Sequence, residues 1–107
     1  MSMKPRIKVQ DSAKVGDIIE VKTLIGHVME TGQRKDRDGK TVPRNIIHSF
    51  SATFNGRPVF KADLQAGISA NPYLAFYMKV TGPGKFEFTW IDDTGAKVTE
   101  TAALNVT

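Results

Sequence analysis

Side chains that could act as nucleophiles, bases or metal ligands are few in this sequence of 107 residues. It contains no cysteine and only two histidines, His27 and His48. Without thiols, the chain cannot form a disulfide, a thiolate zinc site or a cysteine nucleophile. No serine lies in a Gly-x-Ser-x-Gly elbow, and neither histidine lies in a recognised triad motif. We therefore expect that the chain alone is not an enzyme and has no catalytic residue, metal site or cofactor.

The strongest charged feature is a loop rich in cations. Its cations are Arg34, Lys35, Arg37, Lys40 and Arg44, and two carboxylates, Asp36 and Asp38, lie among them. A calcium loop starting at Asp36 would need a bidentate glutamate where Ile47 stands, so we interpret the segment as a solvated hairpin tip. The loop could also contact phosphate, but it has no aromatic residue on which bases could stack.

The net charge of +4 is unevenly distributed along the chain. Residues 1–61 hold 12 Lys and Arg against 6 Asp and Glu, whereas residues 62–107 hold 3 against 5. Such asymmetry indicates a polarised surface and favours a charged partner. The overall excess is too small for a dedicated nucleic-acid binder.

The elements that must position these residues are strands, because apolar residues recur with a period of two. Glu100 interrupts the last of these rows, so we place it at a bulge or a strand end. His48 lies in a core-facing row, and a partly buried histidine is therefore a better interpretation than a ligand. The five core-facing rows are Ile7 and Val9; Ile19, Val21 and Ile25; Ile46, His48, Phe50, Ala52 and Phe54; Phe86, Phe88 and Trp90; and Val98, Ala102, Leu104 and Val106.

Turn sequences separate these rows. Asn55-Gly56 is typical of a type I′ hairpin, and Asp92–Gly95 predicts a second hairpin. We expect at most one helical turn, between Ala62 and Ala70. Six or seven short strands in about 100 residues predict an antiparallel sandwich of two sheets, with a small OB-type barrel as the alternative.

One predicted strand, Tyr73–Val80, is apolar on both faces. Leu74 and Phe76 begin one face, whereas Tyr73 and Tyr77 lie on the other. A strand of a sandwich needs only one apolar face. The second face is covered either by another loop of this chain or by a partner protein, and tyrosine is common at such interfaces.

No membrane span or leader is expected in this chain. The longest unbroken apolar run is Tyr73–Met78, far shorter than the roughly 20 residues of a membrane helix. The first ten residues contain charges and a proline instead of the apolar run of a secretory peptide.

Several strings resemble the SoxZ family of bacterial sulfur-oxidation proteins, and they occur in the order found in that family. One departure is Val28 after His27, where the family tends to have proline. The resemblance implies an all-β, immunoglobulin-like antiparallel β-sandwich of about seven strands, which forms a single domain over residues 1–107. The matching strings are Met29–Asp36, Asp38–Lys40, Pro43–Ile47, Phe54–Gly56 with Val59-Phe60, Ile68–Leu74 and Trp90–Gly95.

The resemblance also implies a function without catalysis. SoxZ-like chains pair with SoxY, whose C-terminal arm carries a cysteine that holds sulfur intermediates during thiosulfate oxidation. The heterodimer would meet SoxAX-, SoxB- and SoxCD-like proteins in the periplasm, after export together with a partner that carries the signal. Two alternatives stay open: a free-standing ligand-binding or adhesion β-sandwich, and a basic barrel that binds nucleic acid.

We expect the family strings to include the partner-binding residues. Three of them, Arg34, Lys35 and Arg44, could hold a thiosulfonate by charge-assisted hydrogen bonds, although simple solvation of these charges is the competing interpretation. The expected partner-binding residues are Met29, Glu30, Arg34, Lys35, Arg44, Asn71, Pro72, Tyr73 and Tyr77.

Overall fold

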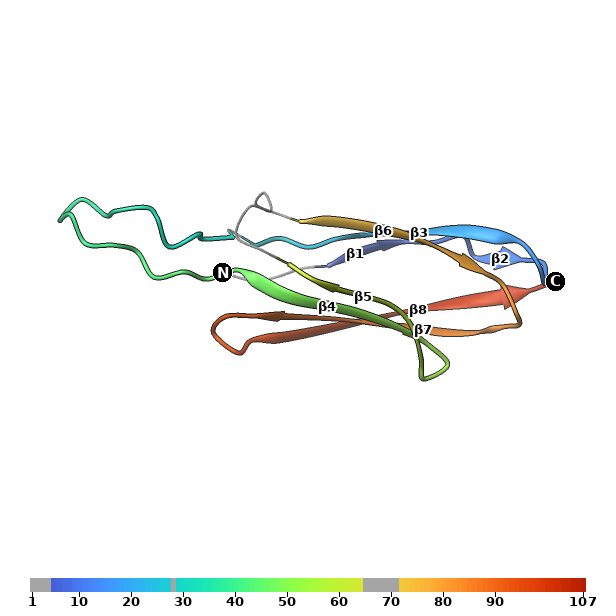
Figure 1. Ribbon diagram of the computed structural model, residues 1–107. Helices are drawn as coiled ribbons and strands as arrows, with labels where there is room; N and C mark the ends of the chain where they lie inside the picture. Colours follow the sequence, from blue (N-terminus) through green and yellow to red (C-terminus); the bar gives the residue numbers. More distant parts are fainter. Residues whose placement is uncertain (1–4, 28, 65–71) are drawn as a thin grey trace.

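The computed structural model describes residues 5–27, 29–64 and 72–107, and every regular element in them is a strand (Figure 1). Alternation of apolar and polar residues has therefore predicted the fold class correctly. The strands are β1 (Arg6–Lys8), β2 (Ser12–Ala13), β3 (Ile18–Leu24), β4 (Ile47–Phe54), β5 (Arg57–Asp63), β6 (Tyr73–Lys79), β7 (Gly84–Asp92) and β8 (Lys97–Val106).

The strands form two sheets that lie face to face, as Figure 1 shows. One sheet has the order β1-β3-β6 and the other has the order β2-β8-β7-β4-β5. The predicted sandwich is confirmed, and the alternative barrel is wrong. The structure adds a short eighth strand, β2, which pairs parallel with β8, whereas β1 pairs antiparallel with β3. The N-terminal segment thus crosses from one sheet to the other.

Aromatic side chains fill the space between the sheets. Phe50, Phe86, Phe88 and Trp90 are almost completely buried, and burial of one such side chain stabilises a fold by roughly 1.5–3 kcal/mol. Contacts between neighbouring rings link β4 and β7, for example Phe50 and Trp90 with centroids 5.2 Å apart. These residues belong to the predicted core-facing rows.

Both predicted hairpins are present. Asn55 and Gly56 have φ angles of 52° and 82°, the left-handed values that a type I′ turn requires. The side chain of Asn55 also accepts a hydrogen bond from the amide of Lys85 at 3.0 Å. This contact ties the β4–β5 hairpin to the start of β7.

Two predictions about single residues in the strands are wrong. A register shift between Ile47 and Ser49 in the β4–β7 pairing turns Ile47 into the core, and His48 is consequently exposed. Glu100 lies neither at a bulge nor at a strand end: it pairs regularly with Phe88 in the middle of β8. The predicted helical turn is absent from Ala62, which lies in β5, and its part at 65–70 lies outside the described residues.

The connection between β3 and β4 forms a long extended hairpin, which we call the finger (residues 29–46). Bridges between Glu30 and Asn45 and between Lys35 and Thr41 join its two arms. The finger projects beyond the end of the sandwich (Figure 1), and the molecule measures 59 Å along this direction against 19 Å across. The predicted polar loop is the tip of this finger.

Candidate functional site

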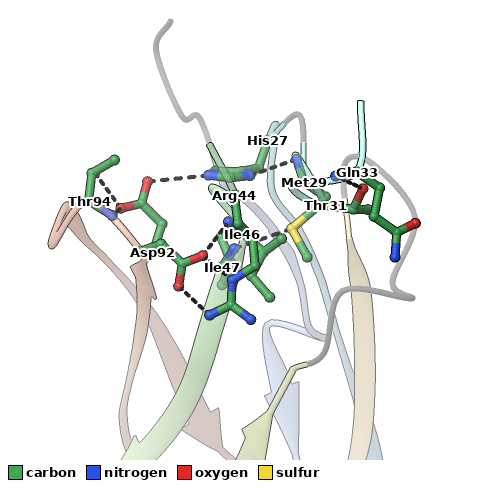
Figure 2. Close-up of polar contacts among 10 residues, drawn as sticks. His27, Met29, Thr31, Gln33, Arg44, Ile46, Ile47, Asp92 and Thr94 are labelled. Atoms are coloured by element: carbon green, nitrogen blue, oxygen red, sulfur yellow. Dashed lines mark hydrogen bonds and ion pairs between the residues drawn. The ribbon is translucent and has the colours of Figure 1, made fainter. Parts of the chain in front are cut away.

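The base of the finger is held by a buried contact between His27 and Asp92 (Figure 2). The amide of Met29 donates to His27 Nδ1 at 2.9 Å, so Nδ1 carries the lone pair. The neutral ring therefore has its proton on Nε2, which donates to Asp92 Oδ2 at 3.2 Å. The two residues are 65 positions apart, and no local pattern indicates that they pair.

Asp92 is satisfied on its other oxygen as well. Oδ1 accepts hydrogen bonds from the Thr94 hydroxyl at 2.6 Å, the Thr94 amide at 2.9 Å and the Ala96 amide at 3.1 Å. Burial by itself would raise the pKa of Asp92, but the hydrogen bonds from Thr94, His27 and Ala96 outweigh burial and lower the pKa below its ordinary value. Asp92 is consequently an anion at neutral pH.

The next residue, Asp93, holds the other arm of the finger. Arg44 donates to its two carboxylate oxygens at 2.8 and 3.1 Å, and the amide of Ile46 donates at 3.2 Å. Partial burial opposes ionisation, but these hydrogen bonds and the charge of Arg44 lower the pKa of Asp93. Two consecutive carboxylates at the end of β7 thus fix both arms of the finger.

The first arm of the finger begins with a strained and buried residue. Met29 has a φ angle of 52°, which is uncommon for a residue with a side chain. Its side chain is 4% exposed, and its Sδ accepts a hydrogen bond from the amide of Ile47 at 3.3 Å. Met29 therefore packs inside the base of the finger, at its junction with β4.

Two of the expected anion-binding cations are already engaged by carboxylates. Arg34 donates two hydrogen bonds to Glu30, at 2.8 and 3.0 Å. These hydrogen bonds and the negative charge of Glu30 raise the pKa of Arg34. Both of these bonds go to Glu30 Oε1, whereas Arg44 donates to both carboxylate oxygens of Asp93. Of the three cations expected to hold a thiosulfonate, only Lys35 has no ion pair among the described residues.

The structure describes eight of the nine expected partner-binding residues, and they lie in two regions. Met29, Glu30, Arg34, Lys35 and Arg44 belong to the finger, whereas Pro72, Tyr73 and Tyr77 belong to β6 or directly precede it. Pro72 is buried, and Asn71 lies outside the described residues. Exposed members are Arg34, Lys35, Arg44, Tyr73 and Tyr77.

The exposed tyrosines lie on the outer face of the sheet β1-β3-β6, which we call the tyrosine face. Tyr73 is 56% exposed and Tyr77 is 71% exposed. Their exposure rules out the alternative in which a described loop of this chain covers them. The second apolar face predicted for this strand is therefore real. The outward residues are Arg6, Lys8, Ile18, Glu20, Lys22, Leu24, Tyr73, Ala75, Tyr77 and Lys79.

Residues 5–27, 29–64 and 72–107 contain neither a candidate metal site nor a membrane-spanning helix. No group of three or more His, Asp or Glu side chains in these ranges could hold a metal ion. Nor do these ranges contain a helix that is long and apolar enough to cross a membrane.

Solved structures with the same fold include superoxide reductases and a sulfur carrier protein. Superoxide reductase (neelaredoxin) of Ignicoccus hospitalis has 14% identity and a TM-score of 0.72, and the match covers 96% of this chain and 80% of that protein. The sulfur carrier protein SoxY of Chlorobium limicola f thiosulfatophilum has 13% identity and a TM-score of 0.67, with coverage of 96% and 78%. At such identities the likeness shows the fold alone.

The family assignment comes from the sequence. No curated protein matches it significantly. The model of the family described as "Sulphur oxidation protein SoxZ" matches residues 7–103, nearly the whole chain. The strings at the finger, at the β4–β5 turn and at the end of β7 all lie within this range. The chain therefore belongs to the SoxZ family of sulfur-oxidation proteins.

Proposed function

We propose that this chain is the non-catalytic subunit of a SoxYZ-type heterodimeric sulfur carrier that serves thiosulfate or sulfur oxidation. The observation that carries the proposal is the SoxZ family match over residues 7–103. In this scheme the partner is a SoxY-like subunit, and the cysteine on its C-terminal arm holds the sulfur intermediates. The solved SoxY structure, named as a sulfur carrier protein, shares the sandwich fold.

The composition of the chain supports this division of labour. Thiolates attack disulfides and other sulfur adducts, so a thiol beside the carrier cysteine would compete for its cargo. The chain has no cysteine, and it therefore cannot divert sulfur from the partner's arm. Its task is to bind the partner and to present a surface to the proteins that visit the complex.

The two regions that contain the expected partner-binding residues have properties suited to these tasks. The tyrosine face carries four large exposed apolar side chains on β3 and β6, and such side chains suit a permanent subunit contact. The finger is polar and projects from the sandwich (Figure 1), which suits brief contacts with SoxAX-, SoxB- and SoxCD-like proteins. We place the complex in the periplasm, exported together with a SoxY-like partner that carries the signal.

Co-expression with the SoxY-like subunit of the same organism tests the proposal. We expect a 1:1 complex by size-exclusion chromatography with light scattering. After incubation with thiosulfate and a SoxAX-like cytochrome, intact-mass spectrometry should find the sulfur adduct on the partner's cysteine and none on this chain. A complex that never forms would contradict the proposal and would favour a free-standing ligand-binding or adhesion sandwich. Salt-sensitive retention of nucleic acid would favour the remaining alternative.

A further inference from the structure

Large exposed apolar side chains gather on one side of this protein. The described residues include five of them, and four lie on the tyrosine face: Ile18, Leu24, Tyr73 and Tyr77. Val15, the fifth, lies in the turn just before β3. Scattered apolar residues need no explanation, but a concentration on one face marks a contact surface.

The other sheet provides an internal comparison. Its outward positions are polar almost throughout, as expected for a sheet face in water. Both sheets consist of strands, so the need for strands alone does not explain the apolar face. These polar outward positions include Ser49, Ser51, Thr53, Lys61, Lys85, Glu87, Lys97, Thr99 and Thr101.

The register of β3 and β6 shapes the surface. Leu24 lies opposite Tyr73, and Glu20 lies opposite Tyr77. Between the two tyrosines stands Ala75, whose small side chain leaves a low point along the strand. Side chains directly opposite each other on neighbouring strands are in contact distance, so a Lys22–Ala75 pair separates the Leu24–Tyr73 pair from the Glu20–Tyr77 pair.

Beside Tyr73 and Leu24 lies an open hollow of about 230 Å³, which also reaches β1. Ligand pockets for small molecules usually measure roughly 300–1,000 Å³ and enclose most of the ligand. This hollow is smaller and open, so it suits one apolar side chain of a protein surface better than a free ligand. Its walls are formed by Arg6, Ile7, Lys8, Lys22, Thr23, Leu24 and Tyr73.

Charge decides which kind of protein can cover the face. Four cations, Arg6, Lys8, Lys22 and Lys79, share it with one carboxylate, Glu20, which gives a net charge of +3. Glu20 pairs with Lys22 at 3.4 Å. Two copies of this face would oppose like charges on contact, whereas a partner whose contact surface carries carboxylates beside apolar side chains would be attracted.

We infer that the tyrosine face is the docking surface for a partner protein whose contact surface combines apolar side chains with carboxylates. The inference rests on the proposed function and specifies where and by what chemistry the SoxY-like subunit binds. Tyr73 and Tyr77 are the anchors, because large aromatic side chains contribute most of the binding energy at such interfaces. One apolar side chain of the partner fills the hollow beside Tyr73.

The test compares affinities for the SoxY-like subunit of the same organism by isothermal titration calorimetry. Replacing the two most exposed apolar residues, Ile18→Ser with Tyr77→Ser, should weaken binding by roughly tenfold or more. The matched control is Thr99→Ser with Thr101→Ser on the polar sheet, which should bind like the wild type. Urea unfolding of each variant confirms that the fold is intact.

Two further measurements address charge and self-association. Lys8→Glu with Lys79→Glu should also weaken binding, and added salt should weaken wild-type binding more than that of this variant. The chain alone should sediment as a monomer.

Wild-type affinity of the Ile18→Ser, Tyr77→Ser variant would overturn the inference while leaving the proposed function intact. A homodimer of the wild type that this variant abolishes would also overturn it, because the face would then belong to a second copy. Absence of any complex with the wild type would instead count against the proposed function.

Discussion

Replacing Asp92 by asparagine tests whether the carboxylate at the end of β7 holds the finger through His27. The substitution keeps the shape of the side chain. Its amide oxygen can still accept the three hydrogen bonds from Thr94 and Ala96. The amide NH₂ must then face His27 Nε2, which carries a proton because Nδ1 accepts from Met29. Two donors oppose each other, and the contact is lost.

Neither partner can repair this contact by rearrangement. If His27 moves its proton to Nδ1, the ring loses the hydrogen bond from the amide of Met29. If the new asparagine flips, its NH₂ group opposes the three donors of Thr94 and Ala96. A hydrogen bond to a charged group is worth about 1.5–3 kcal/mol. Since 3.2 Å is long for such a bond, we expect a loss of about 2 kcal/mol.

The loss can be measured by urea unfolding, followed by the fluorescence of Trp90, the single tryptophan of the chain. A loss of that size corresponds to a fall in Tm of roughly 10 °C for a domain of this length. Asp63→Asn, on an exposed residue of β5, is the matched control and should change stability by less than about 0.5 kcal/mol. Equal stability of the two variants would refute the reasoning, as would ¹⁵N shifts that place the His27 proton on Nδ1.

Three further predictions concern the finger, the core and the pH dependence. Gly32→Ala should speed amide hydrogen exchange in the finger, because Gly32 has a φ of 86° and an added Cβ would lie 3.1 Å from Arg44 Cβ. Phe50→Ala should lower the free energy of unfolding by about 3–5 kcal/mol in urea titrations. Because folding lowers the pKa values of Asp92 and Asp93, the two carboxylates stabilise the fold at pH values above about 3.8, the ordinary pKa of these groups. This stabilisation should disappear as the pH falls through the lower pKa values of the folded state. Acid titration of Asp92→Asn should therefore show a smaller dependence on pH; an unchanged dependence would contradict the assignment.

Local patterns were sufficient for much of the fold. Alternation placed Phe86, Phe88 and Trp90 in the core correctly, because the side chains of a strand point to opposite faces by geometry. Asn55-Gly56 formed the expected turn, since its positive φ angles are a property of the residues themselves. The same alternation of side-chain directions predicted the apolar outer face at Tyr73 and Tyr77 correctly.

Predictions from the sequence were wrong where the outcome depends on contacts between distant segments. An unbroken alternation of apolar and polar residues would place His48 in the core. The bulge that exposes His48 arises from the pairing of β4 with β7. Arg34 and Arg44 looked like free cations, since nothing local indicated that Arg44 would meet Asp93 across 49 positions. For Arg34, a spacing of four residues from Glu30 predicts an ion pair only on a helix. The structure forms this pair in the arm of a hairpin, where the spacing alone does not predict it.

The sequence by itself determined that this protein is built from strands, that it has no thiol to carry sulfur and that one strand is apolar on both sides. These are properties of composition and of short-range geometry. Only the tertiary structure decided that His27 meets Asp92, that both arms of the finger are fixed to the end of β7 and that cations of three strands share one sheet face with the tyrosines. Such contacts join segments far apart along the chain, and they form only when the two sheets pack.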